Sequence, residues 1–554
     1  MTKLVECVPN FSEGRDASVI ERITAAIASV EGATLLDVDP GEATNRTVVT
    51  LVGEPEAVLE AAFRGIKRAA ELIDMRKHSG AHARQGATDV CPFVPVSGIS
   101  VDECVALAKR LGARVGEELD IPVYLYEEAA TRPERRSLAD IRVGEYEALE
   151  QKLAKPEWAP DYGPARFNAQ AGATVIGVRP FLIAYNINLN TRDARIAKQI
   201  GLTMREKGRA KRDTANKRVR DAEGNLVREP GLGHCRATGW FIEEYGRGQV
   251  TMNLTNYEVT PIHVAFDRAC ELAETHGARV TGSEVVGLVP RASLLAAGRH
   301  YLAKQGESTG VSDAVLVDVA VRSMGLDEVA PFEPEQKIIE ERVARARPLV
   351  SATVTAFAEE LAGSSPAPGG GSVAALAGAL GAGLVSMVAS LTYGKKGYGE
   401  HDARMSEIGT RAHALRAKLQ AAVDDDTFAF NDVMSAFRLP KKSEAEQARR
   451  AAAIEAANQH ATEVPLSVLE LLPEVIELAG EVADKGNQNS VSDAGVGALM
   501  GLAAARGAFY NVKINTADIS DTQWKRGVIE RADAALARAE SAAAAIHGRM
   551  LGKL

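Results

Sequence analysis

Segments typical of β-strands occur along the first part of this 554-residue chain and nearly vanish beyond residue 345. The change follows the charged stretch Glu340–Arg347 and Pro348, which we interpret as a connector. Beyond the connector, alanine-rich segments with helical periodicity dominate, so this part is predicted to be an all-α helical bundle. Its predicted helices span about 352–362, 372–393, 402–438, 445–460, 463–484, 492–512 and 521–549.

The opening third of the chain alternates short β-rich runs with helical stretches. Predicted strands are rich in β-branched residues and bounded by turn residues, at Leu4–Val8, Thr34–Val38, Thr47–Val52, Val90–Val94 and Val123–Tyr126. Apolar residues recur at helical spacing in Ala17–Val30, Glu56–Ile73 and Val101–Glu118. This order predicts a split βαβ arrangement, with a mostly antiparallel sheet and helices on one face.

A similar order of elements recurs from Phe181 onward. Strands are predicted at Phe181–Asn188, Gln249–Asn253 and Val280–Val286, and helices at Asp193–Glu206, Pro261–Thr275 and Arg291–Ala303. Two α/β units of similar order indicate a duplicated architecture with a cleft between its halves, where ligands commonly bind. The polar segment Lys207–Pro230 has almost no large apolar residues, so we interpret it as a solvated insertion rather than a mobile loop over the cleft.

Composition narrows the partners and the compartment. The net charge of −9 argues against a general nucleic-acid binder, whose backbone contacts need a basic face. The five cysteines form no CxxC spacing, and the first residues lack the regions of a signal peptide, so we expect a cytoplasmic protein. The uncharged stretch Val373–Leu391 is long enough to span a bilayer, but it consists mostly of Ala, Gly and Ser. We therefore predict a buried bundle helix and no membrane association.

The densest polar cluster of the first unit runs from Met75 to Asp89. His78 and His82 are four residues apart, as in a zinc-binding HExxH motif. No glutamate lies between them and Gly80 weakens a helix, so no metal site is predicted. A polar surface turn and a catalytic loop both remain open.

We favour the catalytic loop, because a histidine beside guanidinium groups can exchange protons at neutral pH. Arg76 and Arg84 supply the guanidinium groups, and Asp89 is near enough in sequence to orient a ring. Polar residues at the ends of two predicted strands, Asn10–Glu13 and Asn45–Thr47, often reach a cleft, although each is weak evidence alone.

Three motifs stand out in the helical part. Ser365–Ser372 opens a helix with three glycines, which indicates either an anion site at the exposed N–H groups or a simple helix entry turn. The acids Asp424–Asp426 cover nearly a full helical turn, so at least one points inward, where its perturbed pKa suits acid–base chemistry. Gly486–Asp493 is a polar break between helices, suited to an Asp493 cap or to ligand contacts.

Several of these motifs resemble those of known enzyme families. The first part of the chain resembles the glutamate formimidoyltransferase family in Leu4–Gly14, Thr44–Thr47, His78–Asp89, Val90–Phe93 and Pro122–Tyr126. The helical part resembles the formimidoyltetrahydrofolate cyclodeaminases in Ser365–Ser372, Leu391–Gly394, Asp424–Thr427 and Arg438–Lys441. Together these motifs resemble the bifunctional formimidoyltransferase-cyclodeaminase family over nearly the whole chain.

The resemblance implies a multidomain fold and two reactions. Two α/β subdomains would occupy 1–181 and 182–343, followed by a linker at 344–351 and a helical cyclodeaminase domain at 352–554. The enzyme would belong to histidine degradation: it would transfer the formimino group of N-formimino-L-glutamate to tetrahydrofolate, then cyclise the product to 5,10-methenyltetrahydrofolate with release of ammonia. Tetrahydrofolate, with or without a polyglutamate tail, would be a co-substrate, with no tightly bound cofactor. Family members are also homo-oligomers.

The resemblance also implies roles for individual residues. His82 would be the general acid of the transferase, and Asp426 the catalytic carboxylate of the cyclodeaminase. The folate-contacting segment would comprise Gly163, Pro164, Ala165, Arg166, Phe167, Asn168, Ala169, Gln170, Ala171 and Gly172.

The chain departs from the animal pattern in three places. Ala81 and Ala83 stand where that pattern has Glu and Pro, residues 165–170 differ, and the 207–230 insertion is additional. These differences leave polyglutamate preference and assembly open. Two alternatives also remain for the helical domain, namely a methenyltetrahydrofolate cyclohydrolase-like domain and a catalytically silent oligomerisation module.

Overall fold

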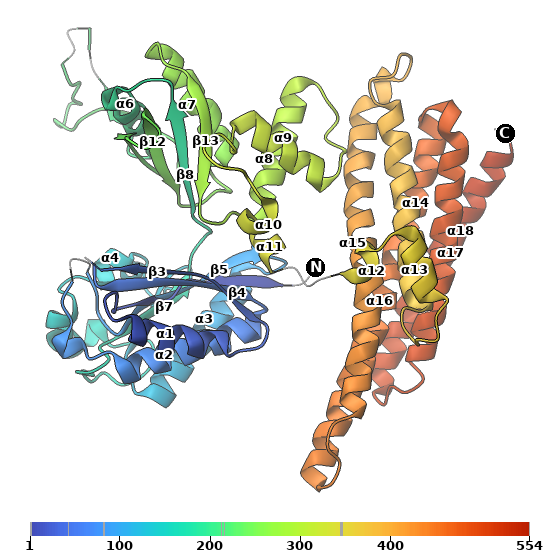
Figure 1. Ribbon diagram of the computed structural model, residues 1–554, viewed down its shortest axis with the longest axis horizontal. Helices are drawn as coiled ribbons and strands as arrows, with labels where there is room; N and C mark the ends of the chain where they lie inside the picture. Colours follow the sequence, from blue (N-terminus) through green and yellow to red (C-terminus); the bar gives the residue numbers. More distant parts are fainter. Residues whose placement is uncertain are drawn as a thin grey trace. The chain divides into compact units, whose positions relative to one another are not determined.

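The computed structural model describes residues 3–42, 44–80, 83–211, 213–214, 217–343 and 347–552. The chain forms two compact units, the first comprising 1–294 and 324–344 and the second comprising 295–323 and 345–554. The first unit contains two α/β subdomains, and the second is built from helices (Figure 1). The predicted multidomain α/β and all-α fold is therefore confirmed.

The N-terminal subdomain is built on a seven-stranded sheet with the order β1-β4-β2-β5-β7-β6, and β3 pairs with β4. The strands are β1 (Leu4–Cys7), β2 (Asn10–Phe11), β3 (Ala33–Gly41), β4 (Arg46–Gly53), β5 (Thr88–Ser97), β6 (Val123–Glu127) and β7 (Thr174–Val178). Among the described residues, β7 pairs in parallel with β5 and β6 and the other pairings are antiparallel, so the sheet is mostly antiparallel as predicted. The sequence analysis missed β2 and β7.

Alternating side chains give this sheet two different faces. One face packs on α1 (Ala17–Ala28), α2 (Pro55–Leu72) and α3 (Val101–Leu119), which lie on the same side of the sheet in Figure 1. Val5 and Cys7 of β1 belong to that core. Because the pleat has a period of two residues, Glu6 points to the opposite face, which carries polar groups.

The second subdomain contains an antiparallel four-stranded sheet with the order β11-β12-β8-β13. Its strands are β8 (Ile183–Leu189), β11 (Cys235–Ile242), β12 (Arg247–Leu254) and β13 (Val280–Val286), and its helices are α6 (Ala194–Met204) and α7 (Ile262–Thr275). The sequence analysis missed β11. In this strand a Cβ atom on Gly239 would lie 2.2 Å from the carbonyl carbon of Ala197, because α6 packs directly on the strand backbone.

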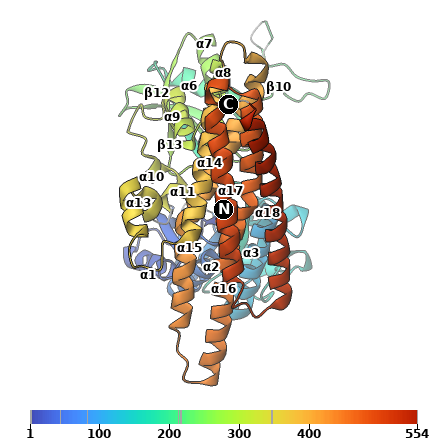
Figure 2. The same cartoon turned by 90° about the vertical axis from the view of Figure 1, so that its right-hand side faces the viewer.

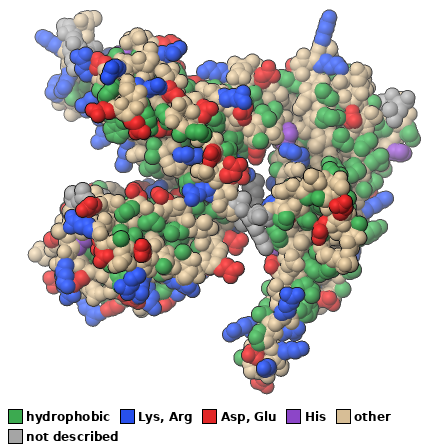
Figure 3. Space-filling model, viewed as in Figure 1, with side chains coloured by type: hydrophobic (Ala, Val, Ile, Leu, Met, Phe, Trp, Pro, Cys, Tyr) green, Lys and Arg blue, Asp and Glu red, His purple; other side chains and the backbone are tan. Residues whose placement is uncertain are grey.

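The insertion predicted at 207–230 contains a small ribbon, in which β9 (Arg209–Ala210) pairs with β10 (Arg228–Glu229). Backbone hydrogen bonds extend the pairing, for example from Lys211 N to Val227 O at 2.8 Å. Lys and Arg side chains gather on this part of the surface (Figure 3). Most of its described side chains are exposed or half-buried, which agrees with a solvated insertion.

Long helices make up the second unit. They are α14 (Gly370–Thr392), α15 (Asp402–Phe437), α16 (Glu444–Lys485), α17 (Val491–Asn515) and α18 (Thr522–Leu551). Figure 2 shows α17 between α14 and α18, in agreement with its contacts to both. Charged side chains gather at the tip where α15 meets α16 (Figure 3). The shorter helices of the two units are α4 (Leu138–Ile141), α5 (Leu149–Leu153), α10 (Pro334–Lys337), α11 (Ile339–Arg342), α12 (Pro348–Ser351) and α13 (Val354–Leu361).

The sequence analysis was wrong to divide 445–484 into two helices, because α16 continues through Pro465 and Pro473. A proline lacks the N–H group that would bind the carbonyl four residues earlier. At Pro465 that carbonyl belongs to Ala461, and the side-chain Nδ2 of Asn515 donates to it at 2.7 Å. A neighbouring helix therefore satisfies the acceptor that the proline leaves, and the helix continues.

Most of α8 (Arg291–Gln305) and α9 (Asp313–Met324) packs within the helical unit, although the family resemblance assigned them to the second α/β subdomain. The turn between them contacts α15. A Cβ atom on Gly310 would lie 2.9 Å from the Cα atom of Gly409, so both positions require glycine for this approach. Ser406 Oγ accepts a hydrogen bond from the N–H group of Thr309 at 3.2 Å.

Within the described part of the chain, α14 is the helix that is long and apolar enough to cross a membrane. The most apolar window of this helix has a mean hydropathy of 1.9, and 61% of that window is buried. Its buried residues belong to the core of the bundle, and they include Ala375, Ala382 and Val385. This burial favours the predicted role as a bundle helix.

Candidate active sites

The loop that follows α2 is anchored to the turn before β4. The side-chain Nδ2 of Asn45 donates to the carbonyl of Ser79 at 3.0 Å. A Cβ atom on Gly80 would lie 2.2 Å from the carbonyl oxygen of Thr44, so only glycine fits there. The glycine that weakened a helical interpretation of the motif therefore allows this close contact.

His78 holds the same loop through both of its ring nitrogens. Its Nε2 donates to the carbonyl of Asn45 at 2.9 Å, and its Nδ1 accepts from Arg84 Nε at 3.2 Å. The ring thus makes one hydrogen bond as donor and one as acceptor. Arg84 in turn pairs with Glu147 and Glu145. The hydrogen bond to Glu147 raises the pKa of Arg84, the hydrogen bond to Glu145 adds to that rise, and burial opposes it. These contacts give His78 a structural role.

Asp89 does not orient the ring of His78, which contacts Asn45 and Arg84 instead. Its buried carboxylate accepts from the N–H group of Gln85 at 3.0 Å and pairs with Arg142. The polar residues at the two strand ends do meet, since Asn10 Oδ1 accepts from Arg46 Nε at 2.9 Å. Burial lowers the pKa of Arg46, and the charge of Asp89 opposes that change.

His82 and Ala81 lie outside the described residues. The chain on either side of them is fixed, by Gly80 against Thr44 and by Arg84 against Glu147. The role of His82 therefore stays a prediction.

The segment 163–172 folds against the histidine-bearing loop. The N–H group of Met75, just before that loop, donates to the carbonyl of Gln170 at 2.9 Å. The Tyr146 hydroxyl donates to the carbonyl of Ala169, and its ring lies 5.4 Å from that of Phe167. The structure therefore brings together two motifs that are far apart in sequence. Contact of this segment with folate stays a prediction.

Two glycines fix the ends of this segment in left-handed conformations. Gly163 has φ +78° and Gly172 has φ +70°, and a Cβ atom on Gly172 would lie 2.2 Å from the carbonyl oxygen of Gln85. Between them Arg166 pairs with Asp120. Gly163, Ala165, Arg166 and Gln170 are exposed, Pro164, Phe167, Asn168 and Ala169 are half-buried, and Ala171 and Gly172 are buried.

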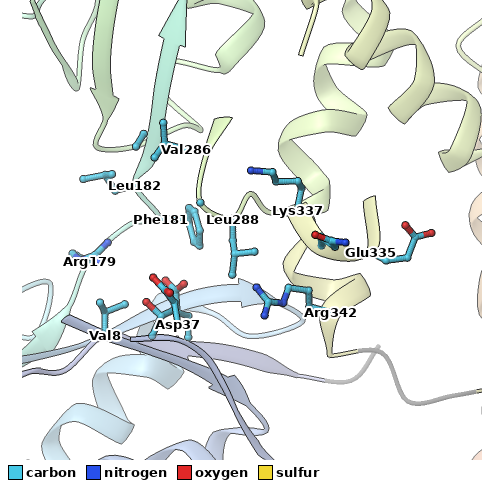
Figure 4. A pocket seen from close by; sticks show the side chains of 15 residues that line it. Val8, Asp37, Arg179, Phe181, Leu182, Val286, Leu288, Glu335, Lys337 and Arg342 are labelled. Carbon is cyan, nitrogen blue, oxygen red and sulfur yellow. The ribbon is translucent and has the colours of Figure 1, made fainter. Parts of the chain in front are cut away.

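A cavity of about 560 Å³ lies on the polar face of the N-terminal sheet and is also lined by the second subdomain (Figure 4). This agrees with the predicted cleft between two α/β halves. Figure 4 shows Arg179 on one side and Lys337 with Arg342 on the other. The lining comprises Glu6, Val8, Asp37, Thr50, Arg179, Phe181, Leu182, Ala184, Val286, Gly287, Leu288, Glu335, Gln336, Lys337 and Arg342.

Sequence analysis did not single out Glu6, which is the buried carboxyl of this cavity. Burial raises the pKa of Glu6 to about 7, and the charge of Arg179 opposes part of that rise. A lone glutamate in a strand carries no signal of this kind. The effect depends on the elements that cover the sheet.

Replacing Glu6 with glutamine should stabilise the protein at pH 8. A carboxyl whose pKa rises from 4.5 to about 7 on folding costs nothing below pH 4.5. The cost then grows as the pH rises through 7, to about 3 kcal/mol of unfolding free energy. Urea unfolding of Glu6→Gln should show this gain at pH 8 and little of it at pH 5. The exposed Asp37→Asn is the control, and an equal gain at both pH values would contradict the prediction.

The three consecutive acids of α15 have three different surroundings. Asp424 is buried and accepts from the N–H groups of Leu349 and Val350, both at 3.0 Å, so it caps α12. Asp425 pairs with Arg347 Nη1 at 2.9 Å. Asp426 faces a cavity. The expectation that at least one of these acids points inward is confirmed.

Asp426 is held at the N-terminus of α14. Its Oδ2 accepts from the N–H group of Ser372 at 2.9 Å and from the Ser372 hydroxyl at 3.1 Å. A Cβ atom on Gly371 would lie 2.1 Å from Asp426 Oδ1, so glycine is required there. Burial raises the pKa of Asp426, and the two hydrogen bonds from Ser372 lower it in part. The anion at this helix N-terminus is thus the protein's own carboxylate.

A cavity of about 340 Å³ opens beside Asp426. Its walls come from the start of α14 and from α15, α16 and α17, and they comprise Pro366, Ala367, Gly369, Gly370, Gly371, Asp426, Phe430, Val433, Phe437, Asn458, Ala461, Asn511, Ile514, Asn515 and Asp518. Sequence analysis missed the three asparagines, because each is one polar residue in a regular helix.

The Gly486–Asp493 break is not part of this cavity. Asn487 accepts from Lys395 Nζ and from the N–H group of Asn489, so Asn487 caps the turn. Asp493 lies in the first turn of α17 and is not its cap, which corrects the sequence interpretation. Within the described ranges, no group of three or more His, Cys, Asp and Glu side chains is placed to hold a metal ion.

Family models match almost the whole chain. Residues 4–179 match the formiminotransferase domain, N-terminal subdomain, and residues 184–344 match the formiminotransferase domain. Residues 353–534 match formiminotransferase-cyclodeaminase.

Curated relatives cover the chain as a whole and in its parts. The formimidoyltransferase-cyclodeaminase of Rattus norvegicus is 43% identical over 99% of both chains. The glutamate formimidoyltransferase of Thermoplasma acidophilum is 44% identical over 55% of this chain and 95% of its own. The methenyltetrahydrofolate cyclohydrolase of Methylorubrum extorquens is 43% identical over 34% of this chain and 90% of its own.

Proposed function

This chain belongs to the formiminotransferase-cyclodeaminase family, and from that premise we propose that it is a bifunctional folate enzyme. Its α/β unit transfers the formimino group of N-formimino-L-glutamate to tetrahydrofolate. Its helical unit then cyclises 5-formiminotetrahydrofolate to 5,10-methenyltetrahydrofolate and releases ammonia. The full-length relatives, whose name contains both activities, support this proposal most directly.

The first reaction needs an acid. N5 of tetrahydrofolate attacks the formimino carbon, and a tetrahedral adduct forms. The glutamate nitrogen is a poor leaving group until it is protonated, and an imidazolium can supply that proton near neutral pH. We assign this role to His82. The assignment is supported by the anchored residues on both sides of His82 in sequence, and by the hydrogen bond from Met75, just before the loop, to Gln170 of segment 163–172.

The second reaction needs one proton to move. N10 attacks the formimino carbon, so the N10–C bond forms and N10 becomes cationic. Asp426 takes the N10 proton and delivers it to the formimino nitrogen, the C–N bond breaks, and ammonia leaves. A carboxyl with a raised pKa suits both steps, and Asp426 meets that requirement inside a cavity.

The decisive experiment supplies the full chain with N-formimino-L-glutamate and tetrahydrofolate. We expect the absorbance of 5,10-methenyltetrahydrofolate to rise and ammonia to appear in equal amount. Release of glutamate without release of ammonia would support only the transferase activity. The absence of both products would overturn the proposal.

A second candidate for the helical unit is a methenyltetrahydrofolate cyclohydrolase, because the relative from Methylorubrum extorquens has that name. The two activities use different substrates. Hydrolysis of 5,10-methenyltetrahydrofolate without ammonia release from 5-formiminotetrahydrofolate would favour the cyclohydrolase. The reverse result would favour the deaminase.

We also propose that a second copy of the chain covers the outer face of α17. Leu499 is 57% exposed there, and Leu380 on the adjacent α14 is 54% exposed. Apolar grooves of about 540 Å³ and 570 Å³ flank α17 on its two sides. The outer face of α17 forms a ridge between the two grooves, and a ridge of this kind on one copy can fit a groove of a second copy, as a twofold interface requires. Exposed apolar patches are typical of such interfaces.

Leu499→Lys should shift the protein to a smaller assembly, because a charge in an apolar interface costs desolvation energy. Light scattering during size-exclusion chromatography measures the change in mass. Val354→Lys is the control, since Val354 is 89% exposed on α13. An unchanged mass for Leu499→Lys would place the interface elsewhere.

A further inference from the structure

The polar groups at one wall of the Asp426 cavity are turned so that they accept hydrogen bonds. Asn511 Nδ2 donates to the carbonyl of Gly507 at 2.9 Å, and Asn515 Nδ2 donates to the carbonyl of Ala461 at 2.7 Å. Each carboxamide therefore donates one of its N–H groups to a helix backbone. The Oδ1 atom of each is left as an acceptor.

Asn511 is the nearer of the two to the catalytic carboxylate. A Cβ atom on Gly370 would lie 3.4 Å from Asn511 Nδ2 and 3.8 Å from Asn511 Oδ1, and one on the adjacent Gly371 would lie 2.1 Å from Asp426 Oδ1. Asn515 lies one helical turn further along α17. The glycines at the start of α14 thus leave space between the Asn511 carboxamide on one side and the Asp426 carboxylate on the other.

The charge of the cavity lining fits the same kind of ligand. Its ionisable side chains are Asp426 and Asp518, and the lining contains neither lysine nor arginine. Within the described residues, the Oδ1 atoms of Asp426 and Asn511 accept no hydrogen bond. Unpaired acceptors in a partly buried site favour a cationic ligand that is rich in N–H donors.

We propose that Asn511 Oδ1 accepts a hydrogen bond from the formimino nitrogen that leaves as ammonia, which makes Asn511 a specificity-determining residue. This inference rests on the proposed deaminase function. The protonated formimino group carries N–H donors on that nitrogen. As N10 bonds to the carbon, Asn511 holds the nitrogen in place while it receives the proton from Asp426, and ammonia departs.

The same geometry discriminates between related folates. A 5-formyl group has an oxygen acceptor where the formimino group has nitrogen donors. The formyl oxygen and Asn511 Oδ1 would then both be acceptors, and no hydrogen bond could form between them. The 5,10-methenyl bridge has no N–H group at that carbon. A site built to accept from the leaving nitrogen therefore selects the substrate of the deaminase over that of the cyclohydrolase.

Asn511→Leu in the full chain tests this inference, because leucine has a similar size and no acceptor. We expect kcat/KM for ammonia release from 5-formiminotetrahydrofolate to fall about 10- to 100-fold, the usual effect of losing a hydrogen bond to a charged group. The inhibition constant of 5-formyltetrahydrofolate should stay within about twofold of the parental value, because that ligand gains nothing from the acceptor.

Asn431→Leu is the matched control, since Asn431 is exposed on α15 and does not line the cavity. Both constants should stay at parental values in that variant. The inference is overturned if Asn511→Leu keeps the parental kcat/KM. It is also overturned if both constants worsen equally, because Asn511 would then support only the cavity wall. If the parental protein releases no ammonia, the proposed function itself fails.

Discussion

Asp426→Asn is expected to lower ammonia release from 5-formiminotetrahydrofolate by about 10²–10⁴-fold, the usual contribution of a general acid–base group. Asparagine keeps an oxygen that can accept the two hydrogen bonds from Ser372, but it cannot take the proton from N10. Transfer from N-formimino-L-glutamate should stay at the parental rate. The measurement is ammonia release from 5-formiminotetrahydrofolate supplied directly, so that the transferase is bypassed.

Asp425→Asn is the control for this prediction, because Asp425 is the adjacent acid and pairs with Arg347 outside the cavity lining. It should release ammonia at nearly the parental rate. Parental ammonia release by Asp426→Asn would remove the proposed role, and an equal loss in both variants would point to a disturbed helix.

The pH profile of the parental protein provides a further readout of Asp426. Burial raises the pKa of this carboxyl, so its proton is lost at a higher pH than that of an exposed aspartate. Proton abstraction from N10 requires the ionised form. The rate of ammonia release should therefore fall as the pH drops through the raised pKa, and Asp426→Asn should lose this acid limb.

The sequence predicted most of the fold because its helices and strands are long and regularly patterned. It missed β2, which has only two residues, and β7, which follows a Gly- and Pro-rich stretch that indicates a turn. It divided α16 at 461–462, just before Pro465, whereas in the structure Asn515 of a different helix binds the carbonyl of Ala461 and the helix continues. Such errors arise where a distant partner decides the local structure.

The candidate sites were predictable to a smaller extent. Helical periodicity showed that one of three acids must point inward, but the resemblance was needed to choose Asp426. Asn511 and Glu6 carried no local signal, since the role of each depends on elements packed against it. Asp89 is close in sequence to His78, yet its charge is paired with Arg142, which comes from a different part of the chain.

His82→Ala is expected to lower formimino transfer by about 10²–10⁴-fold, because the glutamate nitrogen would then leave without a proton. Ammonia release from supplied 5-formiminotetrahydrofolate should continue at the parental rate. The two activities can be measured on one preparation, which shows directly that the variant protein is folded. Near-normal transfer by His82→Ala would contradict the assignment.

The neighbouring histidine gives this prediction its control, because the contacts of His78 argue against a catalytic role. Both ring nitrogens of His78 are engaged, with the carbonyl of Asn45 and with Arg84. These contacts leave neither ring nitrogen of His78 free to face a substrate. His78→Gln can still donate to the Asn45 carbonyl, and it should keep transfer within about tenfold of the parental rate while lowering stability. If His78→Gln instead lost as much transfer as His82→Ala, the acid would be the wrong histidine, and proton delivery would have to run through the Asn45–His78–Arg84 contacts.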